Sequence, residues 1–415
     1  MKKMMKYFVR MAVPILVLAC CAFNANALDK SYYAESSKLA TGKWVKISVR
    51  ESGIYQITAD DIRSWGLGSD LSQIHVFGYG GAPLSEMMSG DNYADDLPQT
   101  PIVRTGDRIL FYAQGPVTWR TSTSLDQMQV QHPYAITGSY LVTNDPQFSD
   151  IEIAKATNEP TGNIETTYTA RLFHEQELIN SGETGRKFLG ESFSSTKTQN
   201  FTFDLDGLVS GSEVKVATMF GAKTVGGKSN LTLTTNNDNV NTLVIDSVLN
   251  VQSHIHYKLK QLITTVTLDE GKTTLDHSID YSCKGTVYLA RLDYITVNYE
   301  RQLALKNGSL LFALSKASSG TRYRMSNCGS TTRVWDVTKP FALVQLNTEA
   351  GDGGTLTFSS ASSGYREFVA FDESGTYSHP EFMGEVSNQN IHGELTPDMI
   401  ILAPGAYLEQ AQRVA

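Results

Sequence analysis

The longest strand pattern in the sequence is Val287–Tyr299, which reads VYLARLDYITVNY. Alternate residues of a β-strand face opposite sides of a sheet. A regular strand would place Val287, Leu289, Arg291, Asp293, Ile295 and Val297 on one face, and Tyr288, Ala290, Leu292 and Tyr294 on the other. Both faces are mostly apolar, which is typical of a strand with packed neighbours on each side. We therefore predict that this stretch is a central strand.

Shorter strand patterns surround it between residues 201 and 371. The clearest are Glu213–Phe220, Leu231–Thr235, Val334–Val337 and Arg366–Phe371. Turns such as Gly226-Gly227 separate them, and no helical pattern interrupts the series. The pattern predicts a mainly β fold class with a jelly-roll-like β-sandwich over residues 161–372. One short helical segment is expected near its start, around Leu172 to Ile179.

Residues 28–160 predict a separate N-terminal β-rich domain. Its strand patterns are Trp44–Val49, Ile54–Ile57, Ile74–Phe77, Asp107–Ala113 and Tyr140–Thr143. Thr58 and Asp61 have the spacing of a capping box, and Gly66 marks the end of the short helix that follows. The cluster Gly78-Tyr79-Gly80-Gly81 lacks GxGxxG spacing and a following helix, so it indicates a turn and not a phosphate-binding loop.

The first 27 residues have the three parts of a secretory signal peptide. A basic region runs to Arg10, an apolar region runs from Met11 to Phe23, and Ala25-Asn26-Ala27 offers a cleavage site before Leu28. Val17-Leu18-Ala19-Cys20 partly resembles a lipobox, so lipidation at Cys20 is the alternative. Either reading predicts an exported protein.

The charge balance excludes nucleic acid as an expected partner. The formal net charge is −8, and the leader holds four of the basic residues within its first ten positions. No basic block remains outside the leader, whereas nucleic-acid-binding domains carry clustered Lys and Arg.

The C-terminal region predicts a change of fold class. Residues 373–395 are polar and turn-rich, and we interpret them as a linker. Met399–Ala403 then forms a short apolar run of branched residues, and Tyr407–Ala415 has the spacing of an amphipathic helix. A single β-α unit leaves its strand uncovered. We therefore expect residues 396–415 to be the truncated first β-α unit of an α/β domain, and the chain to be the front part of a larger protein.

Few residues in the chain have the spacing of a reactive or metal-binding site. Cys283 and Cys328 are the cysteines beyond the leader; they form a disulfide or remain two free thiols, and neither has the flanking pattern of a nucleophile. His254 and His256 would share a strand face without a third metal ligand, and His392 lies in the linker. Asp91–Asp96 is an acidic loop without the spacing of a calcium site. No catalytic residue, cofactor or metal site is predicted.

Several segments resemble the type IX secretion system sortases, which are gingipain-like cysteine peptidases. The matching segments are Asn388–Gly393, Asp398–Leu402, Gln410–Ala415, Lys43–Ile47, Gly53–Tyr55, Asp96–Pro98 and Gly106–Tyr112. The resemblance implies a caspase-like α/β domain whose catalytic His and Cys lie downstream of Met399. Because the sequence ends before both positions, we expect this chain to be inactive alone.

The same resemblance implies the setting of the larger protein. Such sortases remove C-terminal sorting signals from secreted cargo and attach the cargo to the cell surface, beside an outer-membrane secretion partner protein. It therefore implies a location at the cell surface or outer membrane of a Gram-negative bacterium. The alternative function is a stand-alone surface adhesin or glycan-binding β-sandwich module.

Overall fold

The computed structural model describes residues 33–86, 95–157, 159–182, 187–237, 239–394 and 399–415. The predicted signal peptide and Cys20 lie outside these residues. The chain divides into two compact units, a large one of residues 42–83 and 98–387, and a small one of residues 1–41, 84–97 and 388–415.

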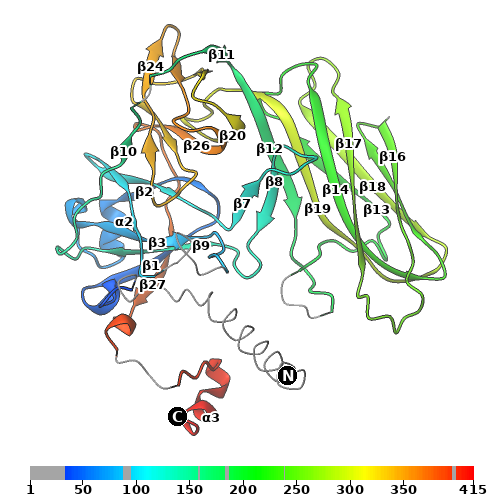
Figure 1. The fold of residues 1–415 in the computed structure, drawn as a ribbon, viewed down its shortest axis with the longest axis horizontal. Helices are drawn as coiled ribbons and strands as arrows, with labels where there is room; N and C mark the ends of the chain where they lie inside the picture. The colour runs from blue at the N-terminus through cyan, green and yellow to red at the C-terminus, as the bar shows by residue number, and fades with distance from the viewer. Residues whose placement is uncertain (1–32, 87–94, 158, 183–186, 238, 395–398) are drawn as a thin grey trace, which may run out of the picture. The chain divides into compact units, whose positions relative to one another are not determined.

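Eight strands of the large unit form a jelly roll, the two sheets of which face each other in Figure 1. The first sheet has the order β12 (Thr167–Glu175), β19 (Thr286–Gln302), β14 (Glu213–Val225) and β17 (Lys258–Thr267). The second has the order β13 (Thr198–Asp204), β18 (Thr274–Cys283), β15 (Ser229–Thr235) and β16 (Asn239–Ile245). Counted along the chain, the sheets contain strands 1-8-3-6 and 2-7-4-5, which is a jelly-roll arrangement of two Greek keys. The predicted jelly roll is confirmed.

β19 is a central strand, as predicted, because it pairs with β12 on one side and with β14 on the other. The predicted faces are wrong, however. Ala290 and Leu292 lie in the core together with Ile295 and Val297. The pairing with β14 shifts register between Met219 and Phe220, so Asp293 is an extra residue opposite that step. Such a β-bulge exchanges the two faces for the rest of a strand.

β12 corrects a second prediction, because Leu172 to Ile179 does not form a helix. Residues up to Glu175 belong to β12, which pairs with β19 over nine residues. Tyr168, Ala170 and Leu172 alternate toward the jelly-roll core. The alternation of apolar residues with a period of two starts before the segment that we interpreted as helical. Pairing with β19 also supplies hydrogen bonds that a short helix would lack.

A second pair of sheets occupies much of the rest of the predicted sandwich range, 161–372. One sheet has the order β10 (Ala154–Lys155), β23 (Val344–Gln345), β22 (Thr332–Asp336), β26 (Gly364–Asp372) and β20 (Ser309–Ala317). The other has the order β11 (Asn163–Glu165), β21 (Thr321–Met325), β25 (Thr355–Phe358) and β24 (Thr348–Gly351). Phe312, Phe358 and Phe368 pack between them and continue the jelly-roll core.

The N-terminal part of the large unit contains three small antiparallel sheets (Figure 1). They are β27 (Glu381–Val386), β1 (Trp44–Val49), β9 (Gly138–Thr143), β3 (His75–Gly80) and β4 (Gln99–Thr100); β2 (Gly53–Thr58), β6 (Arg108–Ala113) and β5 (Ile102–Thr105); and the hairpin of β7 (Val117–Arg120) and β8 (Met128–Gln131). α2 (Ala59–Ser64) begins at the predicted capping box, in which Thr58 and Asp61 cap each other, and Gly66 follows it with φ +74°. A 3-10 turn, η3 (Leu71–Gln73), precedes β3.

β27 lies inside the range 373–395 that we interpreted as a linker. It pairs with β1 at the edge of the N-terminal sheet, so the chain returns to its first strand after the sandwiches. Phe382 and Met383 are both exposed, and Gly384 lies beside a register shift in the pairing. An edge strand with little buried apolar surface has no clear alternation in its sequence, which explains the difference.

The small unit contains short helical turns. They are η2 (Lys38–Ala40), η5 (Ile391–Gly393), η6 (Gly405–Tyr407) and α3 (Leu408–Gln412). Asn390 Oδ1 accepts a 2.8 Å hydrogen bond from Ser37 N, and Leu39 O accepts one of 3.1 Å from Gln389 N. Among the described residues, no helix is both long and apolar enough to cross a membrane.

The predicted strand at Met399–Ala403 is not formed. Residues 399–404 have no regular secondary structure, and Ile400 is 73% and Leu402 is 92% exposed. A strand is stable only with a pairing partner, and none of the described strands pairs with this segment. The helix predicted after it is present as α3.

Candidate functional site

The two cysteines beyond the leader are free thiols in the structure. Cys283 ends β18, and its Sγ accepts a hydrogen bond from Gly285 N at 3.3 Å. Cys328 lies in the turn after β21, with its Sγ 3.8 Å from Met325 O. Burial raises the pKa of Cys328 to about 11, so this thiol stays protonated at neutral pH. Of the two outcomes left open by the sequence, the structure has the unpaired thiols.

The other candidate residues are not brought together. His254 and His256 lie in an exposed loop and not on a strand, and no cluster of metal-binding side chains occurs among the described residues. Within the acidic loop, residues 91–94 lie outside the described residues. Asp95 accepts a hydrogen bond from Ala34 N and lies 3.6 Å from His392 Nδ1, while Asp96 accepts one from Lys38 N. These two carboxylates therefore hold the small unit together.

Side-chain hydrogen bonds hold the β7–β8 hairpin against the outer face of the jelly roll. Asn298 of β19 bonds both the N–H and the C=O of Gln127, each at 2.9 Å. Next to this pair, Thr296 Oγ1 of β19 donates to Gln129 Oε1 of β8 at 2.5 Å. All four side chains are at least 95% buried. Since buried polar groups need partners, this network fixes where the hairpin lies.

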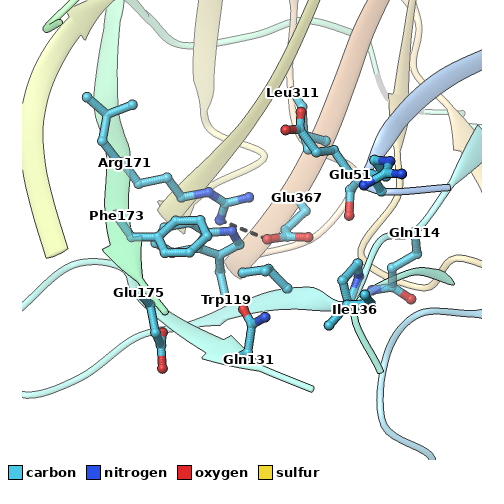
Figure 2. Close-up of a pocket in the computed structure, with 15 residues that line it drawn as sticks. Glu51, Gln114, Trp119, Gln131, Ile136, Arg171, Phe173, Glu175, Leu311 and Glu367 are labelled. Carbon is cyan, nitrogen blue, oxygen red and sulfur yellow. Dashed lines mark hydrogen bonds and ion pairs between the residues drawn. The ribbon is translucent and has the colours of Figure 1, made fainter. Parts of the chain in front are cut away.

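A cavity of about 510 Å³ lies beside this hairpin (Figure 2). Arg171 is its central charge, and its guanidinium lies 4.4 Å from the centre of the Trp119 ring and 2.9 Å from Glu367 Oε1. The rings of Phe173 and Trp119 pack edge to face, with their centres 5.6 Å apart. The walls are lined by Arg50, Glu51, Ser52, Gln114, Pro116, Val117, Trp119, Gln131, Ile136, Arg171, Leu172, Phe173, Glu175, Leu311 and Glu367.

Glu175, which lines the same cavity, belongs to a cluster of three carboxyl groups with Glu177 and Asp293. Asp293 is buried, Glu175 is half-buried and Glu177 is exposed. Burial, followed by the charges of Asp293 and Glu177, raises the pKa of Glu175 to about 8. Burial also raises the pKa of Glu177, which shares a hydrogen bond with Glu175, and that of Asp293. Lys187 Nζ lies 2.7 Å from Asp293 Oδ2 and is the one cation paired with a member of this cluster among the described residues. Burial, together with one ammonium for three carboxyl groups, leaves Glu175 protonated at neutral pH.

These residues were not predicted from the sequence. Phe173 and Glu175 fall in the segment that was interpreted as helical, and Arg171 directly precedes it; their common strand face becomes visible only with a period of two. Trp119 and Gln129 come from the hairpin, and nothing in their own sequence places them against β12 and β19. Alternation from Thr167 onward was the signal available for the β12 residues.

Comparison with solved structures gives an informative match. No protein-family model matches the chain, and no curated protein matches it. Among solved structures, dimeric latent PorU from Porphyromonas gingivalis matches with a TM-score of 0.80 and 28% identity. The match covers 92% of this chain and 36% of the PorU chain, so this chain spans little more than a third of PorU. The fold is therefore PorU-like.

Two structures of viral origin match much more weakly. The infectious bursal disease virus Gx strain has a TM-score of 0.21 and 10% identity, over 91% of this chain and 74% of that chain. The VP2 subviral particle of the same virus has a TM-score of 0.20 and 12% identity, over 81% and 68%. Such low TM-scores carry no argument about this chain.

Proposed function

We propose that this chain is the non-catalytic β-rich portion of a PorU-like cysteine peptidase and transpeptidase that acts as a type IX secretion sortase. The single observation that carries the proposal is the structural match to PorU at 28% identity over 92% of the chain. A match of that extent includes the N-terminal sheets and both sandwiches, whereas a shared jelly roll alone would cover residues 167–302.

In the proposed reaction a cysteine thiolate attacks the peptide carbonyl that precedes the sorting signal. The C–N bond breaks, the signal leaves as an amine, and a thioester forms that an acceptor nucleophile on the cell surface resolves. A cysteine thiol needs a base within hydrogen-bond reach that takes up its proton and so forms the thiolate. Cys283 and Cys328 bond to backbone groups and not to a histidine, so neither is assigned the nucleophile.

The proposed role of this chain is therefore to support a peptidase domain and to contact partners. The partners proposed are secreted cargo proteins with C-terminal sorting signals and an outer-membrane secretion partner protein. The proposed location is the outer surface, after export directed by residues 1–27. β27, the last strand of the large unit, pairs with β1, its first strand. This closed arrangement supports the proposed scaffold role.

An antibody raised against residues 42–387 tests the proposal in the source bacterium. We expect a surface-exposed polypeptide much larger than the 45.6 kDa of this chain, since the match covers 36% of PorU. A species of 45.6 kDa or less, without a larger one, contradicts it. Loss of adhesion together with normal cargo processing after deletion of this region would instead favour the adhesin alternative.

A further inference from the structure

β12 has one hydrogen-bonded neighbour in the described part of the chain. It pairs with β19 along its whole length, and its other side is an edge of the jelly-roll sheet. An edge strand presents a row of backbone N–H and C=O groups that is able to pair with another strand. No described strand is hydrogen-bonded to this edge, but β20 lies close to its first part, where the ring centres of Tyr168 and Phe312 are 5.6 Å apart. The cavity follows the later part, from Arg171 to Glu175, which is where a ligand would enter.

Two hydrogen bonds show which residues of β12 direct their backbone toward this edge. Gln127 Nε2 donates to Thr169 O, so the backbone of Thr169 points away from β19. The pairing with β19 leads to the same conclusion. Glu300, the partner of Thr169 on β19, accepts a hydrogen bond from Val209 N, so its C=O points away from β12. Backbone direction alternates along a strand, so Arg171 and Phe173 also direct N–H and C=O to the free edge.

The cavity follows this edge. Its lining includes three consecutive β12 residues, Arg171, Leu172 and Phe173, and then Glu175. Consecutive residues of one strand line a common space when that space lies along the edge, since a face would expose every second residue. Figure 2 shows Phe173 beside Trp119, with Ile136, Gln114 and Glu51 on the other side of the cavity.

We propose that this edge of β12 binds an extended segment of a partner polypeptide, which adds a strand to the jelly-roll sheet and places a basic side chain at Glu175. Backbone bonds to Arg171 and Phe173 would supply affinity, and side-chain pockets would supply selectivity, as in other cases of strand addition. The assignment concerns a site on this chain and does not depend on the sortase proposal.

The charges around the cavity favour a basic segment. Both guanidinium groups in the lining have carboxylate partners: Arg171 pairs with Glu367 at 2.9 Å, and Arg50 lies 3.6 Å from Glu381. Glu175 accepts a hydrogen bond from Gln129 and shares one with Glu177, but no described cation pairs with it. A Lys or Arg side chain would supply the missing charge and restore the ionised carboxylate.

The apolar lining favours a peptide with alternating side chains. Leu172 packs against the jelly-roll core on one face of the sheet, and Phe173 lies with Trp119 on the other. An added strand therefore meets apolar surface on both faces. Ile136, which lines the cavity and is 80% exposed, offers further contact area at its opening.

Binding of synthetic peptides to the purified full chain tests the proposal. The probes are fluorescent octapeptides of alternating Val and Thr with one Lys, and the same peptides with Gln in place of Lys or with alternate amides N-methylated. By fluorescence anisotropy, we expect the Lys peptide to bind about fivefold more tightly than the Gln peptide. N-methylation should weaken binding by about tenfold, because it removes edge hydrogen bonds.

Two further measurements place the site. Hydrogen exchange should slow at the amides of Arg171 and Phe173 on binding, while Leu172 and His174, already paired with β19, should change little. The variant Glu175→Gln should abolish the preference for Lys over Gln. The control Glu349→Gln, an equal charge change on β24, should retain it.

Four results would overturn the inference. They are no binding by any peptide at millimolar concentration, equal binding of the N-methylated peptide, and slowed exchange at another edge strand while Arg171 and Phe173 stay unchanged. The fourth is protection of these amides that appears with increasing protein concentration alone, which would assign the edge to a second copy of this chain.

Discussion

Replacing Glu175 with Gln should remove much of the pH dependence of hairpin docking. Glu175 has a pKa of about 8 when the hairpin is docked, against an ordinary value of 4.5 when it is solvated. A carboxyl group with a raised pKa holds its proton longer in the docked state. Docking is therefore strongest below pH 4.5, weakens as the pH rises toward 8, and changes no further once the group is ionised in both states.

The magnitude follows from the size of this shift. Each pH unit between the two values costs about 1.4 kcal/mol, and a full shift of this size would cost about 5 kcal/mol. Glu175 shares its proton with Glu177 beside Asp293 and Lys187, so replacing it alone removes part of the cost. We expect Glu175→Gln to stabilise docking by about 2 kcal/mol at pH 8.5 and to leave it unchanged near pH 4.5.

Hydrogen exchange of residues 117–131 measures this opening directly. After correction for intrinsic exchange rates, opening in the wild-type chain should become more frequent between pH 5 and 8.5. In Glu175→Gln it should be about 30-fold rarer than in the wild type at pH 8.5. Gln is a neutral isostere of the protonated acid and still accepts from Gln129. The same pH slope in both proteins would refute the assignment of a half-buried, protonated Glu175, and Glu349→Gln is the matched control.

Three further predictions concern stability, thiol chemistry and export. Arg171→Ala should destabilise the chain by about 2–3 kcal/mol, because Glu367 loses its cation; thermal unfolding should show a smaller loss for Arg171→Lys, and an unchanged midpoint would contradict the role of this pair. Cys283 and Cys328 should both react with a thiol reagent in the unfolded chain and slowly in the native one; a mass two hydrogens lower, as in a disulfide, would contradict the free thiols. The exported chain should begin at Leu28 by intact-mass measurement, with lipidated Cys20 as the alternative start and retention of the leader as the contradicting result.

The jelly roll was predictable because its strands alternate regularly and are separated by Gly and Asn turns. The pattern from Val287 to Tyr299 correctly indicated a central strand. Its faces were not predictable, because the bulge at Asp293 depends on how β14 pairs with β19. A regular period of two continues through a bulge in the sequence, so only the partner strand reveals the change of face.

The cavity was much less predictable than the fold. β12 and the hairpin are joined by hydrogen bonds of the Gln127 and Gln129 side chains to Thr169 and Glu175, and polar side chains of this kind more often lie in water. β27 was missed because its side chains are largely exposed. For Met399–Leu402 the local composition favours a strand, but a strand forms only when another one pairs with it.

The most direct test of the proposed function is the C-terminal mass of secreted cargo in a strain from which the region encoding residues 42–387 has been deleted in frame. The account predicts that cargo keeps its C-terminal sorting signal and is not attached to the surface, and that the intact gene restores processing. Cargo with a normally removed signal and normal surface attachment in the deletion strain would contradict the account.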